Sequence, residues 1–369
     1  MSERSIDLTM ALIDVSSIIQ LAYFGSFIVL MFYGQRIQVS MMLVGVKRNL
    51  GKLERLRKAA HDSVLSSALR FKGDQKAVES RIDRLTGSFA IQPVSMDPSG
   101  IVGKLEHVLD TYDDNLRTEV KSIATGATDA EVNTLSNQME ISIGADQMYR
   151  VVRHFYLLAR KQGGILALYQ LQMAMPQIME EAEAYSSAID AFAKGNPIGD
   201  GIGPLIASKM AEGAQPRDIE QDTIMYETGL DGRTLLLVRA KGPGGSVGKP
   251  GIAVEKLIEQ NSPSLVVTVD AALKFEGEPS GEVAEGVGAA IGGPGVDRYH
   301  IEQSASKRHI PMIAIVVKMS NKEAISAMTQ QVRLAVDEAI RRVKNTIQAS
   351  SKSGDTVIVA GIGNTMGIP

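Results

Sequence analysis

The stretch at residues 195–204 limits the possible folds more than any other part of this chain. It reads GNPIGDGIGP, with four glycines and two prolines in ten residues. This composition excludes a helix interior and a central strand, because glycine weakens both and proline removes a backbone donor. A loop that gives so much backbone freedom to the surroundings of one acid, Asp200, is usually shaped around that acid. A plain turn between two helices is the alternative.

Composition bounds the classes of protein that need to be considered. The 369 residues are enough for more than one domain, and 44% apolar with 22% charged residues indicates a globular chain. The formal charge of −3 argues against a general nucleic-acid-binding protein, so no nucleic-acid partner is expected. The chain has no cysteine, which excludes disulfides, thiolate nucleophiles and cysteine zinc sites.

Residues 15–34 are uncharged over twenty positions. A helix of this length spans roughly 30 Å, the thickness of the hydrocarbon core of a membrane. We therefore predict a transmembrane anchor over residues 1–35 that contacts membrane lipid through residues 15–34. No basic region precedes the stretch and no small-residue cleavage site follows it, which disfavours a cleaved signal peptide. A buried core helix is the alternative.

The charges that flank this stretch predict its orientation. Acidic residues prevail before it, and the basic residues that follow are opposed only by Glu54. The positive-inside rule then predicts a single-pass protein of the cell membrane, with the N-terminus outside and the bulk of the chain in the cytoplasm.

Apolar residues at three- and four-residue steps predict a helical domain over residues 36–194. The long amphipathic helix that opens it favours self-association, so a homo-oligomer is expected. One face of residues 138–161 is basic and aromatic; it is typical of a solvated helix face more than of a nucleic-acid interface.

Apolar strands separated by helical patterns follow, over residues 195–369. They predict an α/β domain with a mainly parallel sheet between two layers of helices. The fold class is therefore α/β: a transmembrane helix, an all-α region and a three-layer α/β/α domain. One buried strand ends at Asp270, at the carboxyl edge where ligands bind to such sheets. A glycine-rich loop around Gly244 precedes a helix and can cradle an anion, although it lacks the spacing of a Walker loop.

Two motifs carry a resemblance to known enzymes. Gly195-Asn196 and Asp200-Gly201-Ile202-Gly203-Pro204 resemble the signature of hydrogenase-maturation endopeptidases and spore germination proteases. Val269-Asp270-Ala271-Ala272 and Gly292-Gly293-Pro294-Gly295 are similar in order and spacing to the germination protease. The resemblance covers about residues 195–320 and implies a phosphorylase/hydrolase-like fold and a protein or peptide substrate. As a whole, the chain resembles an uncharacterised archaeal family with an N-terminal membrane helix.

The resemblance also implies a site. Acids at the positions of Asp200 and Asp270 serve the active or metal-binding site in those enzymes. A later histidine binds nickel in the maturation enzymes, and His300 is its candidate match, so Asp200, Asp270 and His300 are the candidate ligands of a divalent metal. Candidate ligand-binding residues in the surrounding loops are Gly195, Asn196, Gly203, Gly244, Gly293 and Asn364.

The chain departs from these proteases in one respect. In them a β-strand leads directly into the Gly-Asn signature, whereas here a helix precedes Gly195. The last strand, at residues 356–360, is followed by its own Gly363-Asn364 and resembles the missing strand. We infer that it fills the vacant place in the sheet and brings Asn196 and Asn364 to the same edge.

Two functions of different class remain open, besides a third alternative, a membrane scaffold that binds no ligand. In the first, a metal ion or a paired-acid arrangement of Asp200 and Asp270 activates water for amide hydrolysis. In the second, the loops bind a ligand or metal without catalysis, in a scaffold that self-associates. Structural roles compete with each residue: Asp200 as a helix cap, Asp270 as an acceptor for loop amides, and His300 as a surface residue.

Overall fold

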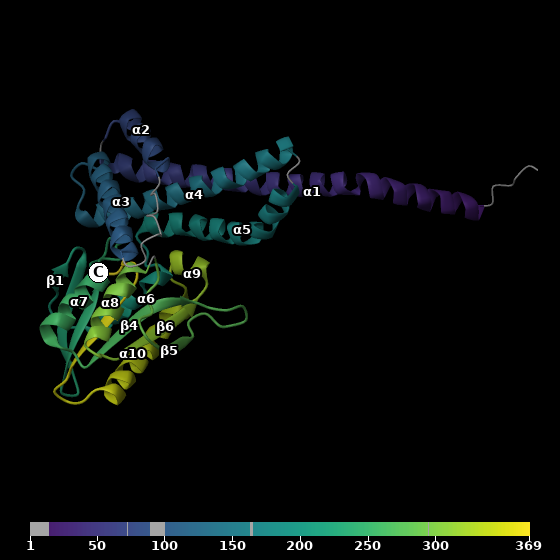
Figure 1. Ribbon diagram of the computed structural model, residues 1–369. Helices are drawn as coiled ribbons and strands as arrows, with labels where there is room; N and C mark the ends of the chain where they lie inside the picture. The colour runs from purple at the N-terminus through teal and green to yellow at the C-terminus, as the bar shows by residue number, and fades with distance from the viewer. Residues whose placement is uncertain (1–14, 72, 89–99, 163–164, 294) are drawn as a thin grey trace, which may run out of the picture. The chain divides into compact units, whose positions relative to one another are not determined.

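The computed structural model describes residues 15–71, 73–88, 100–162, 165–293 and 295–369. An α/β region follows the helical region (Figure 1), and the change falls where glycine and proline end the last long helix. The helices of the first region are α1 (Val15–Ala68), α2 (Gln75–Thr86), α3 (Ile101–Ile123), α4 (Asp129–Gln162) and α5 (Ile165–Lys194).

No helix among these residues combines the length and the apolar character needed to cross a membrane. The predicted transmembrane anchor and the single-pass membrane localisation are therefore wrong. Polar residues such as Gln20 and Ser26 lower the hydropathy of this segment, and α1 continues past Gly34 without a break. Residues 1–14, on which the predicted orientation partly depended, lie outside the described residues.

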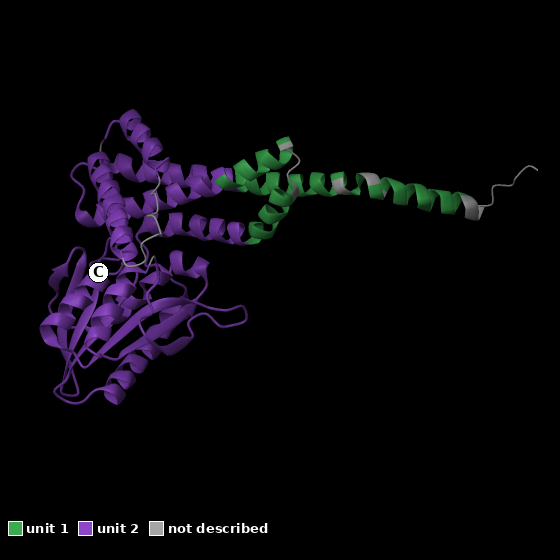
Figure 2. Ribbon diagram, in the orientation of Figure 1, with its two compact units in different colours: residues 1–52, 151–176 green, residues 53–150, 177–369 purple. Residues whose placement is uncertain are grey.

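The chain forms two compact units, shown in Figure 2. The smaller unit comprises residues 1–52 and 151–176, and the larger comprises residues 53–150 and 177–369. In the smaller unit, large apolar side chains of α1 are exposed to solvent: Ile18, Leu21, Tyr23, Phe24, Phe27, Val29, Met31 and Tyr33.

The helical part of the larger unit has its own core. Apolar residues of α1 pack there against α2, α3 and the first turns of α4, and fully buried examples are Ala68, Ile82 and Val120. These residues recur at three- and four-residue steps, which places them on one face of each helix. The helical core holds α4 in position, and α4 carries residues of the candidate site.

The sheet has seven strands in the order β1-β2-β3-β7-β4-β6-β5. The four central strands run parallel, whereas the hairpin strands β1 and β2 at one edge and β5 at the other run antiparallel. The predicted mainly parallel sheet is therefore wrong: short turns make β1, β2 and β3 antiparallel at one edge, and at the other edge β5 pairs antiparallel with β6 across a connection that contains a helix. The strands are β1 (Arg217–Glu220), β2 (Thr223–Leu230), β3 (Arg233–Ala240), β4 (Leu265–Leu273), β5 (Val283–Val287), β6 (Met312–Met319) and β7 (Thr356–Gly361).

Helices cover both faces of the sheet. Val357 and Val359 face one core with α6 (Ile202–Met210) and α10 (Gln330–Ser350), and Ile358 and Ala360 face the other with α7 (Pro250–Asn261) and α8 (Val296–Lys307). This alternation is the period of two that a strand buried on both faces requires. The short helix α9 (Asn321–Ile325) follows β6.

The last strand of the chain lies in the middle of the sheet. β7 pairs in parallel with β3 on one side and with β4 on the other. The prediction that the C-terminal strand fills a vacant place in the sheet is confirmed. The chain that leaves β7 therefore emerges at the same edge as Asp270 of β4.

Candidate active site

Asp270 lies near the end of β4, buried to 3% exposure. Its Oδ1 accepts the N–H of Ala271 at 2.6 Å, and its Oδ2 accepts the N–H of Gly292 at 3.1 Å. Burial raises the pKa of the Asp270 carboxyl to about 8, and the negative charge of Asp200 adds to the rise against the two amide hydrogen bonds. At neutral pH Asp270 is therefore predominantly protonated.

Asp200 lies in a single 3-10 turn, Gly199–Gly201, directly before α6. It does not cap either helix, because the N-cap positions are Ile198 and Gly201 and neither makes a side-chain cap bond. Instead its Oδ2 accepts the backbone N–H of Asn364 at 2.8 Å. Burial raises the pKa of the Asp200 carboxyl, and the Asn364 amide opposes that rise. Both acids of the pair thus favour the protonated form more than a solvated aspartate does.

Glycines allow the loop of Asp200 and the tail after β7 to cross at close range. A Cβ on Gly363, whose φ is +130°, would lie 1.9 Å from the carbonyl oxygen of Asp200. A Cβ on Gly203 would lie 2.2 Å from the carbonyl oxygen of Ile362. The tail is also tied to β4 by the N–H of Ile362, which donates to Val269 at 2.8 Å. These close backbone contacts, together with the hydrogen bond from the Asn364 amide to the Asp200 carboxyl, hold Asp200 beside the end of β4.

Asn364 connects the acid pair to a cleft. The residue is 7% exposed, and its Nδ2 donates to Oδ1 of Asn137 on α4 at 3.0 Å. Its Oδ1 accepts the N–H of Met366 at 2.9 Å. Asn364 therefore contacts Asp200 through its backbone amide and lines the cleft.

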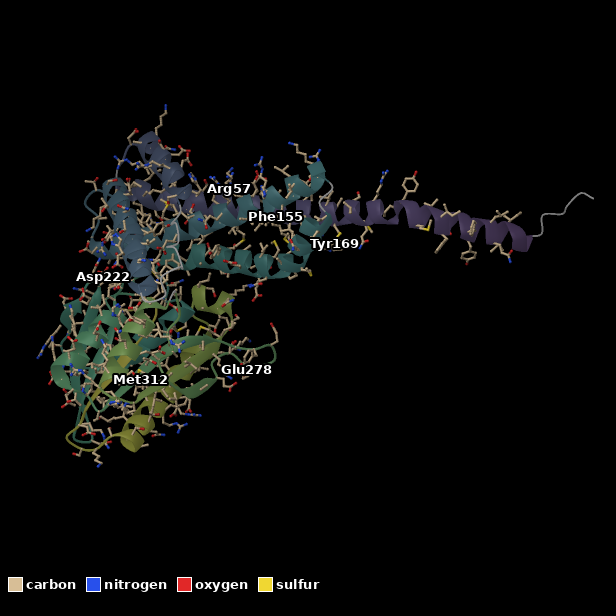
Figure 3. All side chains as sticks on the ribbon, viewed as in Figure 1. Arg57, Phe155, Tyr169, Asp222, Glu278 and Met312 are labelled. Carbon is tan, nitrogen blue, oxygen red and sulfur yellow. The ribbon has the colours of Figure 1, made fainter. Side chains whose placement is uncertain are left out.

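The cleft itself has a volume of about 320 Å³ and lies within the larger unit. Its walls come from α3, α4, the turn at Asp222 (labelled in Figure 3) and the loop at residues 245–249. Glu140 of α4 lines it and is exposed to solvent; partial desolvation in the cleft raises the pKa of that carboxyl, and repulsion from Asp113 adds to the rise. The lining is therefore polar and acidic.

His300 is not bonded to the two aspartates. Its Nδ1 is 2.8 Å from Glu255 of α7 and its Nε2 is 3.2 Å from Glu106 of α3. Among the residues that the structure describes, no three His, Asp or Glu side chains are arranged to hold a metal ion. Because Asp270 keeps its proton and already accepts two amide bonds, the pair fits proton transfer better than metal ligation.

The remaining loop residues that were expected to bind a ligand differ in their surroundings. Gly244 is a packing position, since a Cβ there would lie 2.4 Å from the carbonyl oxygen of Ala130 on α4. Gly195 follows the end of α5 with a φ of +64°, and Asn196 beside it is exposed. Gly293, with a φ of +79°, has open space around it, and its neighbour Pro294 lies outside the described residues. Gly293 lies on the same loop as Gly292, whose backbone N–H donates to the carboxyl of Asp270.

The helical contribution to the site was missed at the level of sequence. Asn133, Asn137 and Glu140 line the cleft from one face of α4. Their spacing of four and three residues is a signal that a polar helix face is turned toward something. The sequence holds no sign that this face meets the tail at Asn364.

Comparison with known proteins identifies a family without an assigned reaction. A family model described as the N-terminal domain of proteins of unknown function DUF1512 matches residues 20–195. A second model, the DUF1512 C-terminal domain of unknown function, matches residues 198–369. No curated protein matches the chain. The chain therefore belongs to the DUF1512 family.

Proposed function

We propose that Asp200 and Asp270 form an acid–base pair that hydrolyses an amide bond in a peptide or protein substrate. The observation that carries the proposal is that the tail after β7 holds Asp200 beside the end of β4, where burial and the charge of Asp200 raise the pKa of Asp270 to about 8. Strongly shifted carboxyls beside a cleft are typical of catalytic acids and bases. The resemblance of the two motifs to maturation and germination proteases supports the same class of reaction.

The chemistry requires one proton shared between two carboxyls. When Asp270 holds the shared proton, Asp200 is ionised and removes a proton from a water molecule as the oxygen of that water attacks the substrate carbonyl. The protonated acid, Asp270, donates its proton to the amide nitrogen, the C–N bond of the tetrahedral intermediate breaks, and the leaving group departs as an amine. The products are a carboxylic acid and an amine, and the pair again holds one proton.

A ligand-binding module without catalysis is the second candidate. Its supporting observation is that both oxygens of Asp270 already accept backbone amides, from Ala271 and Gly292. In this candidate function Asp270 has a purely structural role: it holds its loop in place while the cleft binds a ligand.

Hydrolysis assays with matched variants separate the two. We would measure cleavage of fluorescein-labelled casein and of a panel of fluorogenic peptides by the full chain. Asp200→Asn and Asp270→Asn should each lower the rate by about 100-fold or more. Asp337→Asn on α10, which is 87% exposed in its side chain, is the matched control and should leave the rate unchanged.

The same assay discriminates between mechanisms. A chelator should have no effect on an aspartate pair, whereas loss of activity on chelation would favour the metal-assisted route. If the wild-type chain cleaves nothing in the panel, or if both variants keep its activity, the peptidase proposal fails and the binding module stands.

A further inference from the structure

A second cavity lies in the helical part of the larger unit, bounded by α1, α2 and α4. Its volume is about 510 Å³, within the range of pockets that hold small molecules. Charged and hydroxyl side chains dominate its lining, including Arg57, which Figure 3 labels. None of its lining residues belongs to the acid pair or to the cleft beside it.

Ser142 of α4 gives this cavity a polar group in need of a partner. Its side chain is 0% exposed and lines the cavity, yet its Oγ has no hydrogen-bond partner among the described residues. A serine inside a helix commonly donates to the carbonyl four residues earlier, and Ser142 does not. Gln138, one turn earlier on the same face, is also buried, and its Oε1 is equally unpaired. Since buried polar atoms are almost always paired, a ligand that bonds to Ser142 removes a real deficit.

One end of the cavity is positive. Asp146 is 2% exposed, and its Oδ1 accepts Nη1 of Arg57 at 3.2 Å. Arg150 contacts the other oxygen of the same carboxylate. Lys58, the neighbour of Arg57 on α1, also lines the cavity. Arg57, Arg150 and Lys58 carry three positive charges at this end, against two negative charges on Asp146 and on Glu54, which also lines the cavity. This end therefore keeps a net positive charge and a supply of N–H donors.

The other end is negative. One turn further along α1, His61 and Asp62 line the cavity, and Nε2 of His61 is 3.1 Å from Asp83 of α2. Arg57 and His61 are four residues apart, which corresponds to about 6 Å along the helix axis. The cavity therefore presents opposite charges at a separation comparable with the length of a short molecule.

We propose that this cavity binds a small zwitterion, a molecule with a carboxylate and an ammonium group on a short chain. The carboxylate faces Arg57 and Arg150, which can bind it through paired N–H groups. The ammonium group faces Asp62 and Asp83, and the hydroxyl of Ser142 bonds to the ligand between them. A small-molecule site of this kind is separate from the amidase proposed for Asp200 and Asp270.

Three compounds of equal chain length test the charge pattern. Calorimetric titration of the full chain would compare 4-aminobutanoate with butanoate, which lacks the ammonium group, and with butylamine, which lacks the carboxylate. The zwitterion should bind at least about tenfold more tightly than either. Equal binding of butanoate or of butylamine would indicate a simple anion or cation site and overturn the proposal, as would the absence of saturable binding.

Variants locate the binding. Ser142→Ala, Lys58→Gln and Asp83→Asn should each weaken 4-aminobutanoate severalfold. Lys76→Gln and Glu79→Gln, exposed positions of α2 outside the cavity, are the matched controls and should bind as the wild type does. Thermal unfolding with and without the compound provides a second readout, because a ligand that binds only the folded state raises Tm. Ser142→Ala that still folds and still gains the full Tm shift would overturn the proposal.

Discussion

Two buried aspartates of the larger unit show how neighbours decide what a carboxyl does. Asp270 and Asp146 are 3% and 2% exposed. Asp146 lies between two guanidinium groups, those of Arg57 and Arg150, so its negative charge is compensated. Asp270 has only backbone N–H groups and a second acid nearby, and its pKa rises to about 8. Burial alone therefore does not mark a proton-transfer site; burial without a cation does.

The largest expected effect is on the pH dependence of stability. The pKa of Asp270 is higher in the folded chain, at about 8, than its ordinary value of 3.8, so folding favours the protonated form. The stabilisation is complete below about pH 4 and is lost as the pH rises through 8, by up to about 5 kcal/mol. Asp270→Asn should unfold at higher denaturant concentration than the wild type at pH 8.5 and show a flatter pH profile. Asp200, whose pKa is also raised, retains a share of the dependence.

A result in the opposite direction would break the comparison. Should Asp270→Asn be less stable than the wild type at pH 8.5, the carboxylate of Asp270 is stabilised in the fold, as an ion-paired acid is. Asp337→Asn, on the surface of α10, is the control for a general effect of removing one negative charge.

Asp146, the ion-paired acid, should destabilise the fold when its charge is left without a cation. Replacing both Arg57 and Arg150 with Met leaves Asp146 buried without a cation and should cost about 3 kcal/mol of unfolding free energy. The lower end of the usual range is appropriate because both guanidinium groups are partly exposed. Adding Asp146→Asn to that double variant should restore part of the loss. Equilibrium denaturation of the three proteins measures the difference, and an unchanged midpoint in the double variant would show that Asp146 does not depend on its cations.

A smaller effect is expected where backbone contacts hold the acid pair. Gly363→Ala forces a Cβ against the carbonyl of Asp200 at a φ of +130°, and should cost at least about 2 kcal/mol as well as lowering any hydrolysis. Gly293→Ala is the matched control, with a positive φ but nothing within 4 Å, and should cost about 1 kcal/mol. Equal losses for the two would mean that the close crossing of the loops does not position Asp200.

Much of the acid-pair site could be predicted from sequence because its determinants are local. A run of glycines around Asp200, an apolar strand ending in Asp270 and a last strand with its own Gly-Asn are each visible within ten residues. The absence of a strand before Gly195 indicated that the last strand joins the sheet, and the structure places it between β3 and β4.

The features that the sequence did not predict depend on contacts between residues far apart in the chain, or on the average hydropathy of a whole segment. The meeting of Asn137 and Asn364 joins residues 227 positions apart, and no local pattern encodes it. The contacts of His300 with Glu255 and Glu106 likewise join residues far apart in the sequence, and its role as a metal ligand stays a prediction. The mainly parallel sheet was wrong because edge pairing depends on connections more than on strand composition. The membrane anchor was wrong because an uncharged stretch is not by itself an apolar one.

The central claim, that Asp270 keeps a proton at neutral pH beside Asp200, can be measured directly. Infrared difference spectra of the full chain labelled with ¹³C-aspartate would follow protonated and ionised carboxyl bands from pH 4 to 10, with Asp270→Asn to assign them. One protonated aspartate that persists at pH 7, titrates near pH 8 and disappears in the variant is the result expected from its burial. Complete ionisation of every aspartate by about pH 5, close to the ordinary value, would contradict it.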